Sequence, residues 1–223
     1  MKVVQVMGLL LASCLLAGCF EGSQDLVVEE DGSATFQTRM AMEASLMQMA
    51  DDDDFCSEED TPVMEGISVE HENFTENDMA VCLITASGPI DRLAEWMEEA
   101  SHSPGGDSDE MMEAPTVTLK REGSDYVFSV LIESSPLDLG GDDPMMEEMK
   151  PMLMAAFAGR SLGWSVSAPE ILETNGELSE DGQTASYSIP LANLLDEAAS
   201  DRTFEVRFAL ASSPGLFRRL LGN

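Results

Sequence analysis

Basic side chains are scarce in this sequence. Its 223 residues include 11 Lys and Arg against 43 Asp and Glu, which gives a formal net charge of -32. Because a surface this acidic repels phosphate groups and anionic lipid headgroups, the composition excludes a nucleic-acid partner and favours cations or basic partners. Hydrophobic residues make up 43% of the chain, so we expect a packed core and not wholesale disorder.

Long apolar runs are scarce as well. The run from Val3 to Leu16 is too short to cross a bilayer comfortably as a mature helix, and no second stretch of spanning length follows it. It comes after Lys2 and ends in Leu16-Ala17-Gly18-Cys19. A positive start, an apolar run, small residues and a cysteine in this order are typical of a bacterial lipoprotein signal, and the last four residues resemble its lipobox.

The lipobox resemblance implies how the chain is processed. Residues 1–18 would be cleaved as a signal peptide, and the thiol of Cys19 would carry a diacylglyceryl group that holds the protein on a membrane. The next residue is Phe20 and not Asp, which in Gram-negative lipoproteins implies transport to the outer membrane. The alternative is an ordinary secretory signal cut after Ala17. In either case we expect export, with residues 19–24 as a tether in the lipidated form.

Four cysteines limit the disulfides and metal sites. Cys14 leaves with the signal and Cys19 is lipidated, so Cys56 and Cys82 remain as an even pair in an oxidising compartment. We predict a disulfide between them, which closes a loop of roughly 25 residues and stabilises the fold by about 3 kcal/mol; the alternative is two buried free thiols. With two histidines in the chain, no thiolate and imidazole cluster for zinc remains.

Residue patterns predict an α+β fold with a mainly antiparallel sheet, two or three packed helices and a single domain. Phe36, Thr38, Met40 and Met42 alternate with polar residues, which indicates a half-buried strand over 34–42. A hairpin is predicted over 116–132, around the turn 122–125. Further strands are expected at 25–28, 66–70, 79–85, 164–166, 184–189 and 204–210.

Helices are expected in four places. Pro89 can open a helix whose apolar face carries Ile90, Leu93, Ala94 and Met97. Shorter helices are expected at 43–50 and 190–198, and a kinked one from Pro144 towards Phe157. The domain would span 25–215, with acidic loops near 51–62 and 101–115 and a basic tail at 216–223. That tail would touch a membrane, fold onto the acidic body, or fray.

A serine hydrolase is the first enzymatic alternative. Gly159-Arg160-Ser161-Leu162-Gly163 matches the Gly-x-Ser-x-Gly elbow, with Ser161 as the nucleophile. The elbow joins a strand to a helix, whereas here the motif follows a predicted helix and precedes a predicted strand. The available bases are His71, in a polar stretch, and His102, in a loop. We therefore expect no catalytic residues and no enzyme.

Metal binding is the second alternative. The run Asp51–Asp54 offers oxygen ligands to calcium, but the glycine and final glutamate of an EF-hand are missing. Methionine pairs such as Met40 and Met42 offer thioethers to copper. Both features also suit a solvated loop and a packed core, and we predict no dedicated metal site and no cofactor.

The Met-rich segment before residue 160 suggests an apolar groove instead. Met146, Met149, Leu153 and Phe157 share the predicted kinked helix. Flexible methionines against a sheet form an adaptable surface, which could admit an acyl chain or the helix of a partner protein.

Three segments together resemble the LppM-domain bacterial lipoproteins. They are the lipobox, the strand-turn-strand segment 25–36, and the segment 168–191 with its Asn-Gly and Asp-Gly turns. The resemblance implies an α+β domain displayed in the cell envelope, with a lipid- or glycan-related binding role and no catalytic residues to transfer. We therefore predict a lipid-anchored, non-enzymatic envelope protein that binds a protein partner or an amphiphile.

Overall fold

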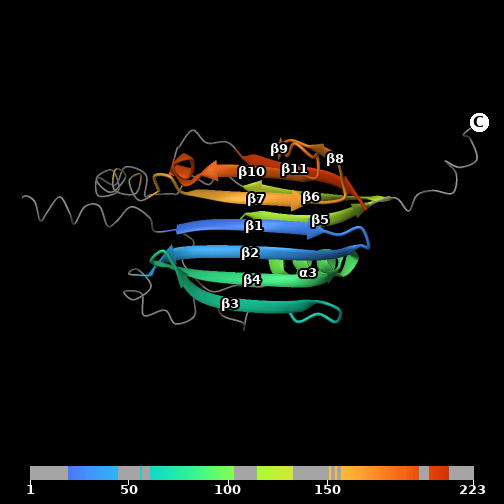
Figure 1. Ribbon diagram of the computed structural model, residues 1–223, viewed down its shortest axis with the longest axis horizontal. Coiled ribbons are helices and arrows are strands. Elements are labelled where there is room, and N and C mark those ends of the chain that lie inside the picture. Colours follow the sequence, from blue (N-terminus) through green and yellow to red (C-terminus); the bar gives the residue numbers. More distant parts are fainter. Residues whose placement is uncertain are drawn as a thin grey trace, which may run out of the picture.

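The computed structural model describes residues 20–44, 56, 61–102, 115–132, 151, 154, 157–195 and 201–210 (Figure 1). Strands dominate this part of the chain. In sequence order the elements are β1 (Phe20–Val28), β2 (Ser33–Glu43), β3 (Ser68–Glu76), β4 (Met79–Pro89), α3 (Ile90–His102), β5 (Thr116–Glu122), β6 (Asp125–Ile132), β7 (Ser161–Ser167), β8 (Glu170–Thr174), β9 (Glu177–Leu178), β10 (Thr184–Pro190), the 3-10 helix η1 (Leu191–Leu195) and β11 (Arg202–Ala209).

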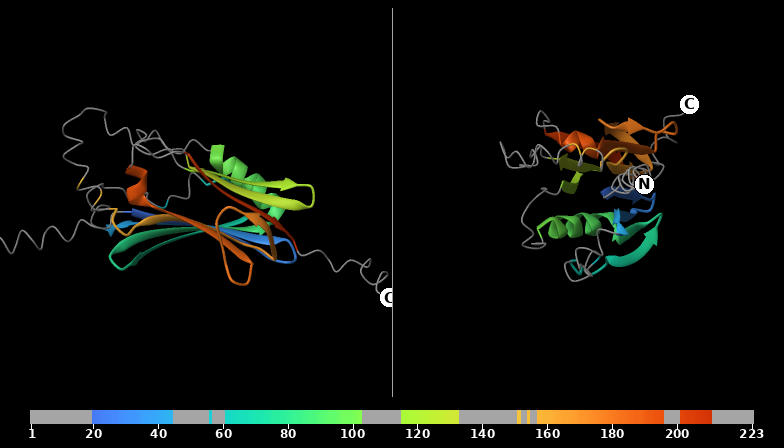
Figure 2. Two further views of the ribbon diagram at one scale, coloured as in Figure 1. Left: turned by 90° about the horizontal axis from the view of Figure 1, so that it is seen from above. Right: turned by 90° about the vertical axis from the view of Figure 1, so that its left-hand side faces the viewer.

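The strands form two sheets that pack face to face. The large sheet has seven strands in the order β3-β4-β2-β1-β7-β10-β9, and the small sheet has four in the order β5-β6-β11-β8. All neighbours are antiparallel except β1 and β7, which run parallel from Gly22 beside Leu162. Figure 2 shows α3 lying next to β5, so that the helix and the small sheet together cover one face of the large sheet.

Side-chain alternation assigns the two faces of the large sheet. In β2, Ala34 and Phe36 are buried, as the sequence predicted for this strand. Their partners Val28 and Leu26 in β1 are buried too, and they belong to the same core as Phe128 of the small sheet. We call this side of the large sheet the inner face and the opposite side the outer face.

Helix α3 buries the face that the sequence predicted. Ile90, Leu93 and Met97 are at most 4% exposed, and Ala94 packs against the same core. Pro89 is the last residue of β4 and the helix begins at Ile90, whose N–H donates to the carbonyl of Gly32 in the β1–β2 turn. The amphipathic pattern was therefore a sufficient guide to this helix and to its buried face.

The α+β prediction is wrong for the described part of the chain, which is mostly β. Its strands form two sheets and not one, and α3 is the one α-helix described along its whole length. β2 ends at Glu43 and Ala44 is helical, so the helix expected at 43–50 lies almost wholly outside the described residues. The expected helix at 190–198 is replaced over its described part by η1. β8 and β9 were not predicted. Short apolar runs fit either a helix or a strand, and here pairing between distant strands decided the outcome.

Other expected elements have mixed outcomes. The hairpin over 116–132 is confirmed as β5 and β6, and the single domain is confirmed. Residues 20–24, expected as a tether, belong to β1. The acidic loop residues 51–55 and 103–114, the basic tail 216–223 and most of the kinked helix lie outside the described residues.

Tyr126 gives a prediction about stability at alkaline pH. Burial and the hydrogen bond that its hydroxyl donates to Asp91 at 2.8 Å raise the pKa of Tyr126 to about 12. The unfolded chain ionises this phenol near its usual pKa of about 10, so its contribution is complete below pH 10 and is lost as the pH rises towards 12. We expect the free energy of unfolding to fall by about 2 kcal/mol over this range through this group.

The Tyr126→Phe variant isolates this effect. It should be about 1 kcal/mol less stable at pH 8 because the Asp91 bond is lost, yet it should lose less stability between pH 8 and 11.5. Urea unfolding of both proteins at the two pH values measures the difference. Parallel losses in the two proteins would contradict the assignment.

Candidate functional site

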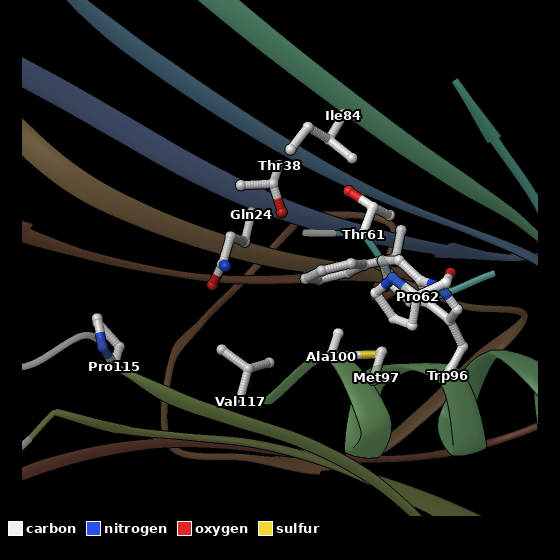
Figure 3. A pocket seen from close by; sticks show the side chains of 11 residues that line it. Gln24, Thr38, Thr61, Pro62, Ile84, Trp96, Met97, Ala100, Pro115 and Val117 are labelled. Carbon is white, nitrogen blue, oxygen red and sulfur yellow. The ribbon is translucent and has the colours of Figure 1, made fainter. Parts of the chain in front are cut away.

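A pocket lies between α3 and the inner face of the large sheet. Its volume is about 250 Å³, and Figure 3 shows the side chains of the sheet facing those of the helix across it. The start of β5 closes one side through Pro115 and Val117. This volume is small beside those of typical ligand pockets, which run from about 300 to 1,000 Å³. The space therefore suits one end of an extended molecule.

The lining of the pocket is mainly apolar. The apolar side chains are Phe36, Ile84, Trp96, Met97, Ala100 and Val117. Three uncharged polar side chains, Gln24, Thr38 and Thr61, complete the surface together with two prolines. None of the described residues that line the pocket is charged. The lining suits an uncharged, largely apolar group with one or two hydrogen-bonding atoms.

Gln24 is held in position by a tryptophan. Trp164 Nε1 donates to Gln24 Oε1 at 2.8 Å. Because an indole N–H only donates, the bond turns the carbonyl oxygen of Gln24 towards Trp164 and leaves the amide group as the donor. Gln24 pairs with Thr38 across β1 and β2, so both point to the inner face. The pocket therefore has an amide and a hydroxyl side by side on its sheet wall.

The opposite rim is formed by the segment before β3. The carbonyl of Pro62 accepts a hydrogen bond from Trp96 Nε1 at 2.9 Å, and Thr61 Oγ1 lies 3.3 Å from His71 Nε2. These contacts fix Thr61 and Pro62 above the helix and the edge of the sheet. Among the described residues, His71 Nδ1 is the one buried side-chain nitrogen or oxygen without a hydrogen-bond partner.

A disulfide joins Cys56 to Cys82, as the cysteine count predicted. The two Cα atoms are 5.4 Å apart, and Cys82 is fully buried on the inner face of β4. Cys82 lies two residues before Ile84 of the pocket, and Cys56 precedes Thr61 in the chain. The cross-link therefore ties the chain five residues before Thr61 to the strand that carries Ile84 of the sheet wall.

Comparisons with known proteins show which structure the fold resembles. No protein-family model matches the chain, and no curated protein is significantly similar in sequence. Among solved structures, the NMR structure of the folded domain of LppM from Mycobacterium tuberculosis is similar, with a TM-score of 0.50. The match covers 88% of this chain and 93% of that one, at 11% sequence identity. The chain thus has an LppM-like fold.

The described residues do not form the serine-hydrolase arrangement. Ser161 begins β7 after a turn at 157–159, and β7 continues as a strand, so no elbow into a helix is formed. Ser161 pairs with Pro190 and points to the outer face, whereas His71 pairs with Ile84 and points to the inner face. Three strands separate β3 from β7 in the sheet, which places the two residues on the order of 19 Å apart.

The expected groove residues are mostly outside the described part. Met146, Met149 and Leu153 belong to undescribed segments, and Phe157 lies half-buried in a turn. Cys19 and the lipobox residues Leu16, Ala17 and Gly18 are outside it as well.

The metal alternative gains no support in the described residues. No group of three or more His, Cys, Asp or Glu in them could hold a metal ion, and Asp51–Asp54 lies outside them. Met40 and Met42 both point to the inner face of β2, where each is half-buried. Within the described residues, moreover, no helix has the length and apolar character needed to cross a membrane.

Sequence reasoning missed the pocket but had one signal for it. Gln24 and Thr38 are polar residues at inward positions of strands whose other inward residues, such as Leu26 and Phe36, are apolar. A polar side chain at a core position needs a partner or a solvent-filled space. The register of β1 against β2, which brings the two together, could not be read from either strand alone.

Proposed function

We propose that this protein is a lipid-anchored, non-enzymatic component of the cell envelope that binds the apolar end of an amphiphile. The lipid sits on Cys19 and holds the protein on the outer membrane. The pocket between α3 and the large sheet is the binding site. The observation that carries the proposal is the uncharged, mainly apolar lining of this pocket.

The anchor is supported by the sequence. Leu16-Ala17-Gly18-Cys19 matches the lipobox in full and follows an apolar run of the right length. The Cys56–Cys82 disulfide suits a protein that folds outside the reducing cytoplasm. The LppM-like fold agrees with a lipoprotein domain, although at 11% identity it speaks for the fold alone.

The ligand class follows from the lining. An acyl or other hydrocarbon chain gains free energy from contact with Phe36, Ile84 and Met97 at roughly 25 cal/mol per Å² of apolar surface buried. A charged headgroup would lose its hydration there without a charged partner, so it stays at the pocket mouth. Gln24 and Thr38 can donate hydrogen bonds to an ester or amide carbonyl near the head of the chain.

Filling the pocket tests the proposal. In the Ala100→Phe variant an aromatic ring enters the pocket from α3, and we expect binding of an apolar fluorescent probe such as N-phenyl-1-naphthylamine to weaken at least tenfold. Ala100→Ser is the matched control, because it changes the same position with little change in volume, and it should bind the probe as the parent does. A fluorescence titration of the three proteins gives the affinities. Equal binding by all three would exclude this pocket as the site.

A further inference from the structure

The first strand begins at the residue next to the proposed anchor. β1 starts at Phe20, which is bonded directly to Cys19. Consecutive Cα atoms are 3.8 Å apart, so the lipid-bearing residue lies within one peptide unit of the large sheet. A flexible linker at this point would let the folded domain turn freely relative to the lipid, but no residue separates Phe20 of β1 from Cys19.

The start of β1 is paired with a neighbouring strand on each side. Phe20 pairs with Met42 of β2, and Gly22 pairs with Leu162 of β7. The carboxylate of Glu21 accepts hydrogen bonds from Arg39 Nη1 and from Arg160 Nη1, each at 2.8 Å. The bond from Arg39 is the largest of the effects that lower the pKa of Glu21, so this carboxylate stays ionised between its two arginines. The strand is therefore held in the sheet up to its first residues.

One end of the large sheet is formed by residues that pair with Phe20 directly or through a neighbouring strand. Met42 of β2 pairs with Ala80 of β4, and Ala80 pairs with Thr75 of β3, beside the turn that joins these two strands. β7 begins and β10 ends at this same end (Figure 1). We call it the anchor end. The β1–β2 turn at Gly32 marks the opposite end, about 30 Å away at roughly 3.3 Å per residue of strand.

We infer that the anchor end of the large sheet stands against the bilayer surface, with the β1–β2 turn directed away from it. The inference rests on the lipid at Cys19 in the proposed function. The absence of any residue between Cys19 and β1 sets this orientation. At the anchor end, Arg39 and Arg160 are paired with carboxylates, and Glu21, Glu76 and Asp78 outnumber them. The surface that this end contacts is therefore one of zwitterionic headgroups, and anionic lipids repel it.

Resonance energy transfer from a dye on β3 to an acceptor dye on the lipid headgroups measures the orientation of the sheet. Thr75 and Ser68 are exposed residues of this one strand, seven residues or about 23 Å apart, and both are close to cysteine in size. The Thr75→Cys and Ser68→Cys variants, purified with their lipid and labelled without reductant, each take one dye, since Cys19 is blocked and Cys56–Cys82 is oxidised. The proteins are bound to phosphatidylcholine vesicles that contain an acceptor dye on their headgroups.

Transfer from position 75 should exceed transfer from position 68 several-fold. A variant with ten Gly and Ser residues inserted between Cys19 and Phe20 should give similar transfer from both positions, because a flexible linker lets the domain turn. Equal transfer in the native chain, or more transfer from position 68, would overturn the proposed orientation. It would not contradict the lipid on Cys19. A mature protein without acyl mass, with a reactive Cys19 thiol, would overturn both the anchor and the orientation.

Discussion

Replacement of Phe128 by alanine is expected to destabilise the fold by about 3 to 5 kcal/mol, the cost of deleting a large aromatic side chain from a closed core. Phe128 is fully buried, and its ring lies between the two sheets. The ring centroids of Phe36 in the large sheet and of Phe204 in the small sheet are 6.5 and 6.3 Å away. Its removal takes contacts from both sheets at once, and urea unfolding measures the loss.

Phe74→Ala is the matched control. Phe74 lies in the edge strand β3, points to the outer face and is 39% exposed. Since much of its ring already meets water, we expect a loss of about 1 kcal/mol or less. A similar loss for Phe74 and Phe128 would mean that the packing between the sheets is not the main source of stability.

Removal of the Cys56–Cys82 disulfide is expected to have the second largest effect. The bond spans a sequence separation of 26, and a loop of this size stabilises the folded state by about 3 kcal/mol through its effect on the unfolded chain. In Cys56→Ala/Cys82→Ala the free energy of unfolding should fall by this amount, measured by urea unfolding. The change should also weaken binding of the apolar probe, because Thr61 and Pro62 of the pocket rim follow Cys56 in the chain.

Reductant gives an internal control for the disulfide. Treatment of the parent protein with dithiothreitol should reproduce the destabilisation and weaker probe binding of the double variant, and it should leave the double variant unchanged. If the parent keeps its stability after complete reduction, the cross-link does not stabilise the fold. If stability falls but probe binding does not, the rim segment keeps its position without the bond.

Local patterns in the sequence were sufficient for some elements. The alternation in β2 and the apolar face of α3 each arise within one segment, and both predict which side chains are buried. The β5–β6 hairpin is equally local, since its turn at Gly123 has a φ of 69° that glycine adopts without strain. The cysteine pair was found by counting, because the predicted cleavage and lipidation leave two candidates for one bond.

The arrangement of the sheets depended on contacts that are distant in sequence. β1 pairs in parallel with β7, so Gly22 lies beside Leu162. No local pattern in either segment predicts this pairing. The edge strand β8 is short and begins with Glu170, a composition that reads as a loop. The expected single sheet was wrong for this reason: most strands were recognised from their own patterns, but the strands that they pair with were unknown.

The site was harder to predict than the fold. The pocket combines β1, β2, β4, α3, β5 and the rim before β3, so its lining exists only after the chain has folded. The residues of α3 that face it, such as Met97, have the same spacing as residues that fill a core. The sequence placed an amphiphile on Met146 and Met149 instead. The described residues place an uncharged pocket on the inner face of the large sheet.

A native mass spectrum of the mature chain tests the central claim, that this pocket binds an amphiphile, most directly. The Cys19→Ser form, exported and purified without detergent, should retain an added mass of an acyl-chain compound, and the Ala100→Phe form of the same chain should not. The bare mass in both forms, after exposure to envelope lipids, would contradict the claim.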